Sequence, residues 1–338
     1  MNSAKKQVIL ALVFILSFGL YLASSDDLRT QELMCFCGNS DSCIAVGKKY
    51  ENDQSKVPHD REKAISYYEK ACNFSNPVGC AALSEFYLDG DIEQFNNKEL
   101  SLKYSIRACM LKDFSSCNEV AKSTNFNKNS ETGAIIVPLL EEGCSFGDRE
   151  SCYIFANNLD RTQKSLKISL YKKSCELDFA KACFSLASMF IGEKHNSTSF
   201  KKSISLFTKG CQLGSADSCL YAGMLRQVDE QNSQNTEKNT EQLRLLYKKG
   251  CDYNSAASCT RLALLYDTKE LTMSDEQLSF KYKKQACKLG DTFACGLLGE
   301  AYEKAIGTQK DLESALIYYF ISCRNNNGFA CKAIERLR

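Results

Sequence analysis

The chain has 338 residues, of which 44% are hydrophobic and 25% are charged, a balance typical of a globular protein that can bury a core. Its 43 basic and 41 acidic residues nearly cancel, which excludes the basic field that a nucleic-acid-binding protein carries. Nineteen cysteines argue against the cytosol, where disulfides are rare because the compartment is reducing.

The first 25 residues are predicted to be a secretory signal peptide. Lys5 and Lys6 precede an apolar run of 16 residues, and small and acidic residues follow. This order is typical of a signal peptide that is cleaved after Ala23 or Ser25. The apolar run is also close in length to a membrane span, so an uncleaved anchor is the alternative. The rest of the chain, residues 26–338, is predicted to be secreted or periplasmic, with a membrane contact only through this segment.

From residue 35 onward, a cysteine, seven residues and a second cysteine recur nine times, with successive first cysteines 31 to 40 residues apart. A helical pattern precedes each pair, turn formers such as Gly290 and Asp291 lie inside it, and a second helical pattern follows. A tight turn between antiparallel helices brings two such cysteines into disulfide range, which a continuous helix cannot do. The predicted disulfides are Cys35–Cys43, Cys72–Cys80, Cys109–Cys117, Cys144–Cys152, Cys175–Cys183, Cys211–Cys219, Cys251–Cys259, Cys287–Cys295 and Cys323–Cys331.

Cys37 is the nineteenth cysteine and lies inside the first of these loops. It is predicted to be an unpaired thiol. Three roles stay open for it: a free thiol, an intermolecular link, or a competitor for pairing with Cys43.

Three stretches depart from the regular repeat. Pro138 lies six residues before Cys144 and predicts a kink or a late helix start. The spacing of 31 residues before Cys175 predicts clipped helices. The polar stretch between Val228 and Thr240, in the longest spacing of 40 residues, predicts a mobile loop.

An aromatic stripe runs through the helices that precede the cysteine pairs. We expect it to fill the layers between repeats rather than to form a cofactor site. Its members are Tyr67, Tyr68, Tyr171, Phe207, Tyr247, Tyr282, Tyr318 and Tyr319.

The region after Cys295 resembles the Sel-one-like repeat (SLR), a helix pair related to the tetratricopeptide repeat. The residues that carry the resemblance, in the expected order, are Leu298, Gly299, Tyr302, Gly307, Asp311, Ala315, Tyr318 and Tyr319. The regular cysteine pairs are further similar to the SLR subfamily known as Helicobacter cysteine-rich proteins, from about residue 33 to the C-terminus. We therefore expect an all-α fold, an α/α solenoid of about nine helix hairpins in a right-handed superhelix, each stapled by one disulfide.

Members of that subfamily are commonly labelled penicillin-binding proteins or β-lactamases, so the resemblance implies a possible β-lactam chemistry. A serine β-lactamase needs a Ser-x-x-Lys motif together with Ser-Asp-Asn and Lys-Thr-Gly, and the last two are absent. Ser-x-x-Lys occurs three times, as often as chance gives with this composition: Ser3/Lys6, Ser169/Lys172 and Ser199/Lys202. We predict no catalytic residue.

The two histidines, His59 and His195, fall in apparent linkers, and no motif with metal-ligand spacing is present. We predict no metal and no cofactor. The sequence thus favours a monomeric, non-enzymatic scaffold that binds a protein or peptide partner on the concave face of the superhelix. The alternative is a weak penicillin-binding protein or β-lactamase, which the resemblance alone implies.

Overall fold

The computed structural model describes residues 27–52, 59–88, 97–123, 130–191, 197–230, 236–267 and 273–337. The chain divides into two compact units, residues 1–158 and 159–338, and each is described by itself. The predicted signal peptide lies outside the described residues. Within the described ranges all regular structure is helical, and none of these helices combines the length and the apolarity that a membrane span requires.

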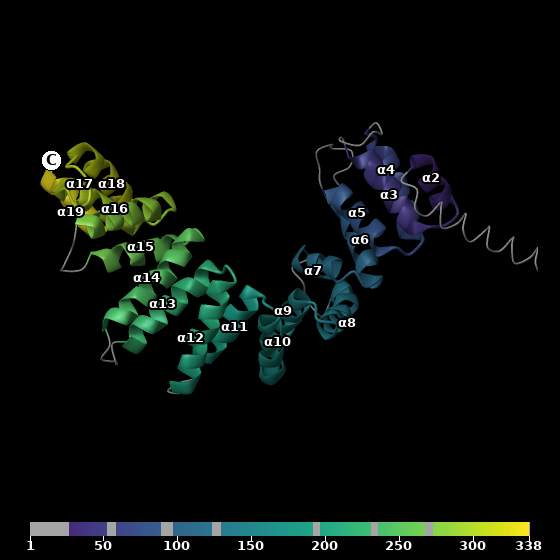
Figure 1. Ribbon diagram of the computed structural model, residues 1–338, viewed down its shortest axis with the longest axis horizontal. Coiled ribbons are helices and arrows are strands. Elements are labelled where there is room, and N and C mark those ends of the chain that lie inside the picture. The colour runs from purple at the N-terminus through teal and green to yellow at the C-terminus, as the bar shows by residue number, and fades with distance from the viewer. Residues whose placement is uncertain are drawn as a thin grey trace, which may run out of the picture. The chain divides into compact units, whose positions relative to one another are not determined.

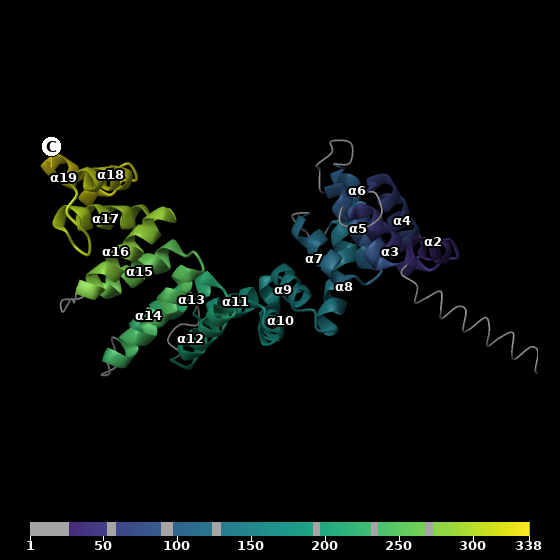
Figure 2. The same cartoon turned by 45° about the horizontal axis from the view of Figure 1, so that its top comes forward.

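The first unit contains four helix hairpins in the part of the chain that is described (Figures 1 and 2). Their helices are α2 (Leu28–Phe36) with α3 (Ser40–Glu51), α4 (Arg61–Asn73) with α5 (Pro77–Leu88), α6 (Lys98–Met110) with α7 (Phe114–Ser123), and α8 (Glu131–Ser145) with α9 (Arg149–Asn158).

The second unit contains five hairpins in its described residues, preceded by the short 3-10 helix η1 (Arg161–Gln163). Their helices are α10 (Lys164–Glu176) with α11 (Ala180–Ile191), α12 (Ser197–Gln212) with α13 (Ala216–Glu230), α14 (Thr236–Asp252) with α15 (Ala256–Tyr266), α16 (Met273–Lys288) with α17 (Thr292–Lys304), and α18 (Leu312–Cys323) with α19 (Gly328–Leu337).

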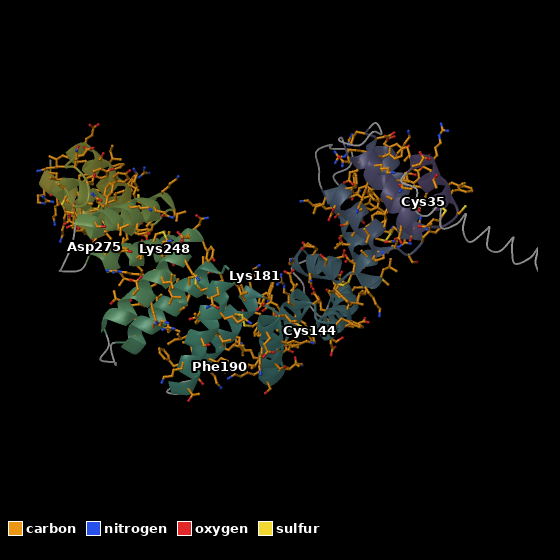
Figure 3. All side chains as sticks on the ribbon, viewed as in Figure 1. Cys35, Cys144, Lys181, Phe190, Lys248 and Asp275 are labelled. Carbon is orange, nitrogen blue, oxygen red and sulfur yellow. A yellow bond between two sulfur atoms is a disulfide. The ribbon has the colours of Figure 1, made fainter. Side chains whose placement is uncertain are left out.

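Each hairpin carries one disulfide, from the last turn of its first helix to the first turn of its second helix. Figure 3 labels Cys35 in the first hairpin and Cys144 in the fourth. The two Cα atoms of every bridge are 4.5 to 4.8 Å apart, inside the range that a disulfide spans. The predicted fold, an all-α array of hairpins each stapled once, is confirmed.

The turn between the two helices is built alike in every hairpin. In the eighth hairpin the N–H of Gly290, at φ 97°, donates to the carbonyl of Cys287, and the N–H of Asp291 donates to that of Ala286, each over 3.0 Å. These two bonds close the first helix as a Schellman motif. The Asp291 carboxylate then caps the second helix through the N–H of Phe293, 3.0 Å away. One residue with positive φ stands three places after each first cysteine: Gly38, Ser75, Lys112, Gly147, Asp178, Gly214, Asn254, Gly290 and Asn326.

Successive hairpins of a unit pack through the second helix of one and the first helix of the next. Four of these interfaces hold two nearly parallel tyrosine rings with centroids 5.7 to 6.0 Å apart: Tyr50–Tyr67, Tyr87–Tyr104, Tyr266–Tyr282 and Tyr302–Tyr318. Of the aromatic stripe that the sequence assigns to these layers, Tyr67 and Tyr318 are half-buried and the other six members are buried.

Two of the predicted irregularities are corrected by the structure. Helix α8 begins at Glu131 and runs through Pro138, so a late helix start is wrong. The hairpin after the short spacing is not clipped in α10, which has 13 residues like α4. The short cysteine spacing is explained instead by α9, which has 10 residues, and by the connection between α9 and α10, which consists mainly of the short helix η1.

The bounds of the loop predicted between Val228 and Thr240 are also wrong. Helix α13 extends to Glu230 and α14 begins at Thr236, while residues 231–235 lie outside the described residues. The reason is that Glu, Lys and Gln are good helix formers, so a polar stretch can lengthen the two flanking helices.

Candidate functional site

The interfaces between hairpins share one position that decides how they are filled, four residues before the first cysteine of each repeat. We call it the filling position. In the second to fourth hairpins of the first unit, this position is occupied by Tyr68, Ser105 and Leu140. In the second to fifth hairpins of the second unit, it is occupied by Phe207, Tyr247, Lys283 and Tyr319. All of these side chains are at most 4% exposed, except that of Ser105, which is half-buried.

A tyrosine at the filling position packs on a glycine, and its hydroxyl reaches a carboxylate in two cases and the amide oxygen of Gln227 in the case of Tyr247. A Cβ added to Gly47 would lie 2.8 Å from the Tyr68 ring, so the close approach requires a glycine there. The Tyr68 hydroxyl donates to Glu51 over 2.6 Å, and the Tyr319 hydroxyl donates to Glu303 over 2.8 Å. Burial, reinforced by the bond to the carboxylate, raises the pKa of Tyr68 and of Tyr319 well above the ordinary value.

Lys283 replaces the tyrosine at the α15–α16 interface. Its ammonium lies 2.8 Å from the carboxylate of Asp267, the residue at the end of α15 that corresponds to Glu51 and Glu303. The hydroxyl of Ser279 donates to the same carboxylate over 2.6 Å. At this interface an ion pair thus links the two helices at the positions where a tyrosine–glutamate hydrogen bond links α3 to α4 and α17 to α18.

The α5–α6 interface is built differently, because Ser105 takes the filling position. The Ser84 hydroxyl forms hydrogen bonds with those of Ser101, over 3.0 Å, and Ser105. In the preceding hairpin Tyr68 packs on Phe86, with ring centroids 5.8 Å apart, and the residue that corresponds to Phe86 is Ser123. Two aromatic rings are therefore replaced by two serines.

A cleft of about 470 Å³ lies at this place. We call it the serine cleft. Helices α5, α6 and α7 line it with Ala81, Ser84, Glu85, Leu88, Lys98, Ser101, Leu102, Ser105, Asp113, Ser115, Ser116, Glu119 and Ser123. Its lining combines hydroxyl groups and carboxylates with the apolar side chains of Ala81, Leu88 and Leu102.

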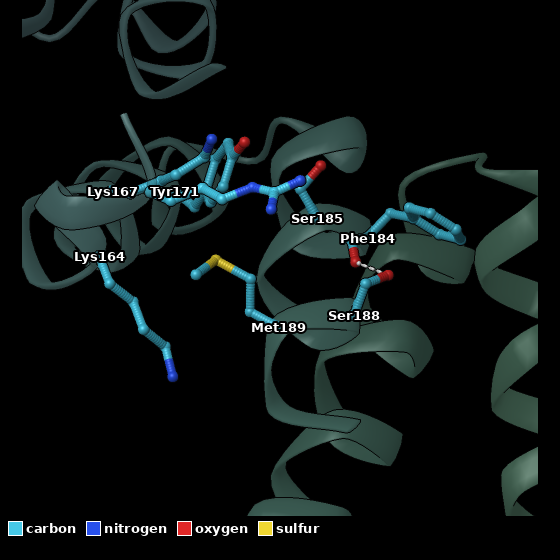
Figure 4. Close-up of a pocket in the computed structure, with 8 residues that line it drawn as sticks. Lys164, Lys167, Tyr171, Phe184, Ser185, Ser188 and Met189 are labelled. Atoms are coloured by element: carbon cyan, nitrogen blue, oxygen red, sulfur yellow. Dashed lines mark hydrogen bonds between the residues drawn. The ribbon is translucent and has the colours of Figure 1, made fainter. Parts of the chain in front are cut away.

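A second cleft, of about 500 Å³, lies in the opening hairpin of the second unit (Figure 4). We call it the basic cleft. Its lining residues are Arg161, Lys164, Lys167, Tyr171, Phe184, Ser185, Ser188 and Met189. The Lys167 ammonium lies 6.0 Å from the centre of the Tyr171 ring, and the Ser188 hydroxyl donates to the carbonyl of Phe184. Residues 161–173 hold five basic and no acidic residues, in a chain whose charges otherwise nearly balance.

The structure places the residues singled out from the sequence as follows. Cys37 is exposed and forms no disulfide with any described residue. His59 is exposed in a loop, and His195 lies outside the described residues. The described ranges contain no group of three or more side chains that could hold a metal ion.

Of the three Ser-x-x-Lys matches, Ser3/Lys6 lies outside the described residues. The Ser169 hydroxyl donates to the carbonyl of Leu166, while Lys172 pairs with Glu176. Lys202 lies over the Phe190 ring, with its ammonium 5.8 Å from the ring centre. Ser169 and Lys172 therefore interact with other groups and not with each other.

Sequence reasoning missed both clefts. The signal for the serine cleft is present in the chain, since aligning the repeats on their first cysteines puts Ser105 in the column of Tyr68, Tyr247 and Tyr319. The basic cleft could have been suspected from the run of basic residues that begins at Arg161.

Comparison with known proteins gives the family of the repeat. The sequence model of the Sel1 repeat matches residues 40–73, 77–113, 256–291 and 292–327. Each match runs from the second helix of one hairpin to the first helix of the next and contains one of the four stacked tyrosine pairs. No curated protein matches the chain.

Solved structures share the fold. A protective antigen of uropathogenic Escherichia coli strains that displays an SLR fold superposes with a TM-score of 0.67 and 17% identity, over 92% of this chain and 66% of that one. This chain thus spans just under two thirds of that relative. A Sel1 repeat protein from Oxalobacter formigenes superposes with a TM-score of 0.65 and 13% identity, over 92% of this chain and 90% of that one.

Proposed function

This chain is a Sel1-repeat protein, and from that premise we propose that it is a monomeric, non-catalytic scaffold that binds a protein or peptide partner. Stacked helix hairpins present extended surfaces on which partners dock, and we assign the partner to the concave face of the array. Function on such a fold depends on the sites that its surface carries, and the clefts are the candidates here.

The observation that carries this proposal is the basic cleft. Arg161 and Lys167 form no ion pair with any described residue, so their charges are available to a ligand. Beside them, the half-buried Met189 supplies apolar surface, and the ring of the buried Tyr171 lines the cleft. Cations around an aromatic and a thioether group suit a peptide that presents a carboxylate next to an apolar side chain.

We further propose that the protein works in an oxidising extracytoplasmic compartment, secreted or periplasmic, with residues 1–25 as its signal peptide or as an uncleaved anchor. The nine disulfides support this location, because such bonds persist where thiols are not kept reduced.

The test is affinity capture from the native envelope or culture fluid with three baits. The baits are the oxidised protein, the cleft variant Arg161→Glu/Lys164→Glu/Lys167→Glu, and the control variant Lys284→Glu/Lys288→Glu/Lys310→Glu, which changes the net charge equally at exposed lysines outside both clefts. We expect a partner that the wild type and the control variant retain and the cleft variant loses.

The β-lactam alternative is the competing outcome. It is measured with a chromogenic cephalosporin and a fluorescent penicillin on the same oxidised protein. Turnover or saturable acylation well above that of a sample with scrambled disulfides would contradict the scaffold proposal.

A further inference from the structure

The serine cleft lies where the neighbouring hairpin places its own tyrosine. At the α3–α4 interface the Tyr68 ring fills the space between Gly47 and Phe86. At the α5–α6 interface the corresponding residues are Ser84, Ser105 and Ser123, and all three line the serine cleft. The fold is the same on both sides of the comparison, so the cleft has the position of a missing phenol ring.

The hydroxyl groups of the cleft have an unused donor. Ser84, Ser101 and Ser105 carry three hydroxyl protons, one each. The bonds Ser84–Ser101 and Ser84–Ser105 use two of them, and these three hydroxyls form no further hydrogen bond with any described residue. One hydroxyl proton is therefore left to donate to an oxygen that enters the cleft.

The charged residues that line the cleft favour a ligand that carries a positive charge next to its phenol ring. Glu85, Asp113 and Glu119 contribute three carboxylates, and Lys98 is the one basic residue in the lining. Lys122 pairs with Glu119 over 2.8 Å, so the acidic character of the cleft comes from Glu85 and Asp113. Residues 26–158 as a whole hold 21 acidic and 14 basic residues. A ligand that brings a positive charge is attracted here, and one that brings a carboxylate is repelled.

We propose that the serine cleft binds a tyrosine side chain of the partner, next to a basic residue. The ring occupies the place that Tyr68 occupies one repeat earlier, its oxygen accepts the one serine hydroxyl proton that is left, and the basic residue faces the carboxylates. A buried aromatic anchor in a pocket is the usual centre of binding energy in an interface. The inference rests on the proposed function, since it names the chemistry by which the scaffold holds its partner.

The α3–α4 interface supplies the substitutions for a test. The double variant Ser84→Gly/Ser105→Tyr, the filled variant, copies the glycine and tyrosine of the α3–α4 interface into the cleft. Ser84→Gly alone serves as the stability reference, and Ser66→Tyr, on an exposed face of α4, adds the same ring elsewhere. We expect the filled variant to unfold at a higher denaturant concentration than Ser84→Gly.

Binding is measured by saturation-transfer NMR with tyramine, which carries a phenol and an amine, and with phenethylamine, which lacks the hydroxyl. A single small ring in such a cleft should bind in roughly the millimolar range. We expect the wild type and Ser66→Tyr to bind tyramine more tightly than phenethylamine, and the filled variant to bind tyramine at least about tenfold more weakly than Ser66→Tyr does.

Equal tyramine binding by the filled variant and Ser66→Tyr would overturn the proposal. So would a filled variant that is less stable than Ser84→Gly, because the cleft would then not fit a tyrosine ring. A captured partner that binds the filled variant as well as the wild type, yet is lost by the basic-cleft variant, would sink this inference and leave the proposed function standing.

Discussion

The α3–α4 and α5–α6 interfaces contain the same stacked tyrosine pair but differ at the filling position. Both have nearly parallel rings whose centroids are 5.7 to 5.9 Å apart, Tyr50 with Tyr67 and Tyr87 with Tyr104. Behind that pair, one interface holds the buried Tyr68 and the other holds Ser105 and the serine cleft. The comparison shows that the stacked pair is common to both interfaces, while the filling position distinguishes a solid interface from a hollow one.

The strongest way to break this comparison is to hollow out the solid interface with Tyr68→Ser. The substitution removes a fully buried ring and its bond to Glu51, so the free energy of unfolding should fall by about 3–5 kcal/mol. The measurement is denaturant unfolding followed by circular dichroism. As the matched change, Ser105→Ala should cost about 1 kcal/mol or less. Similar losses for both variants would show that the two interfaces do not differ as described.

Removing a disulfide next to either interface should have a smaller effect, and the same one in both. Replacing Cys72 and Cys80 by alanine opens a nine-residue loop and should cost about 2.5 kcal/mol. Replacing Cys109 and Cys117 should cost the same, since the turns are built alike. Unequal losses, measured by denaturant unfolding under non-oxidising conditions, would mean that the hollow interface also weakens its hairpin.

Gly47→Ala tests the close contact of the solid interface. The added Cβ would meet the Tyr68 ring at 2.8 Å, and such overpacking costs about 1–3 kcal/mol. Gly328→Ala is the matched control, because a Cβ at that helical glycine has no neighbour within 4 Å. Thermal melting of both variants checks the prediction, and an undestabilised Gly47→Ala would show that the tyrosine ring has room to move.

The smallest expected effect is a dependence on alkaline pH. The pKa of Tyr68 is raised in the folded chain by burial and by its bond to Glu51, so the unfolded chain loses this proton first. The contribution to stability is complete below the ordinary tyrosine pKa near 10 and is lost as the pH rises towards the folded value. Between about pH 9 and about pH 11 the wild type should therefore lose more stability than Tyr68→Phe.

This experiment is carried out in a Cys37→Ser background, because a free cysteine can exchange with the disulfides. Ser105 has no ionisable phenol group, so the stability of Ser105→Ala should change with pH in the same way as that of the wild type. A Tyr68→Phe curve parallel to that of the wild type would contradict the raised pKa.

The hairpins and their staples could be predicted because they depend on local chemistry. Two cysteines eight residues apart, with a turn former such as Gly290 and a capping residue such as Asp291 between them, specify one turn geometry by themselves. The course of α8 through Pro138 could not be predicted this way, because packing within the unit decides whether a helix tolerates a proline.

The clefts escaped prediction for a related reason. A single serine such as Ser105 carries no signal in its own neighbourhood, and its meaning appears only when the residues opposite it, here Ser84, are known. Composition likewise hid the basic cleft, because the acidic excess of residues 26–158 offsets the 27 basic against 20 acidic residues of the second unit.

The disulfide repeat and the Sel1 repeat of this chain begin at different helices, one helix apart. The covalent unit joins the helices on either side of a turn, as in α4 with α5, whereas the Sel1 match joins the helices on either side of a linker, as in α3 with α4. At the four interfaces with a stacked tyrosine pair, a helix is thus bridged by sulfur to one neighbour and held by ring contacts to the other. A truncation beside such a helix severs one of the two kinds of link, so the shortened array ends in a helix that has lost part of its support.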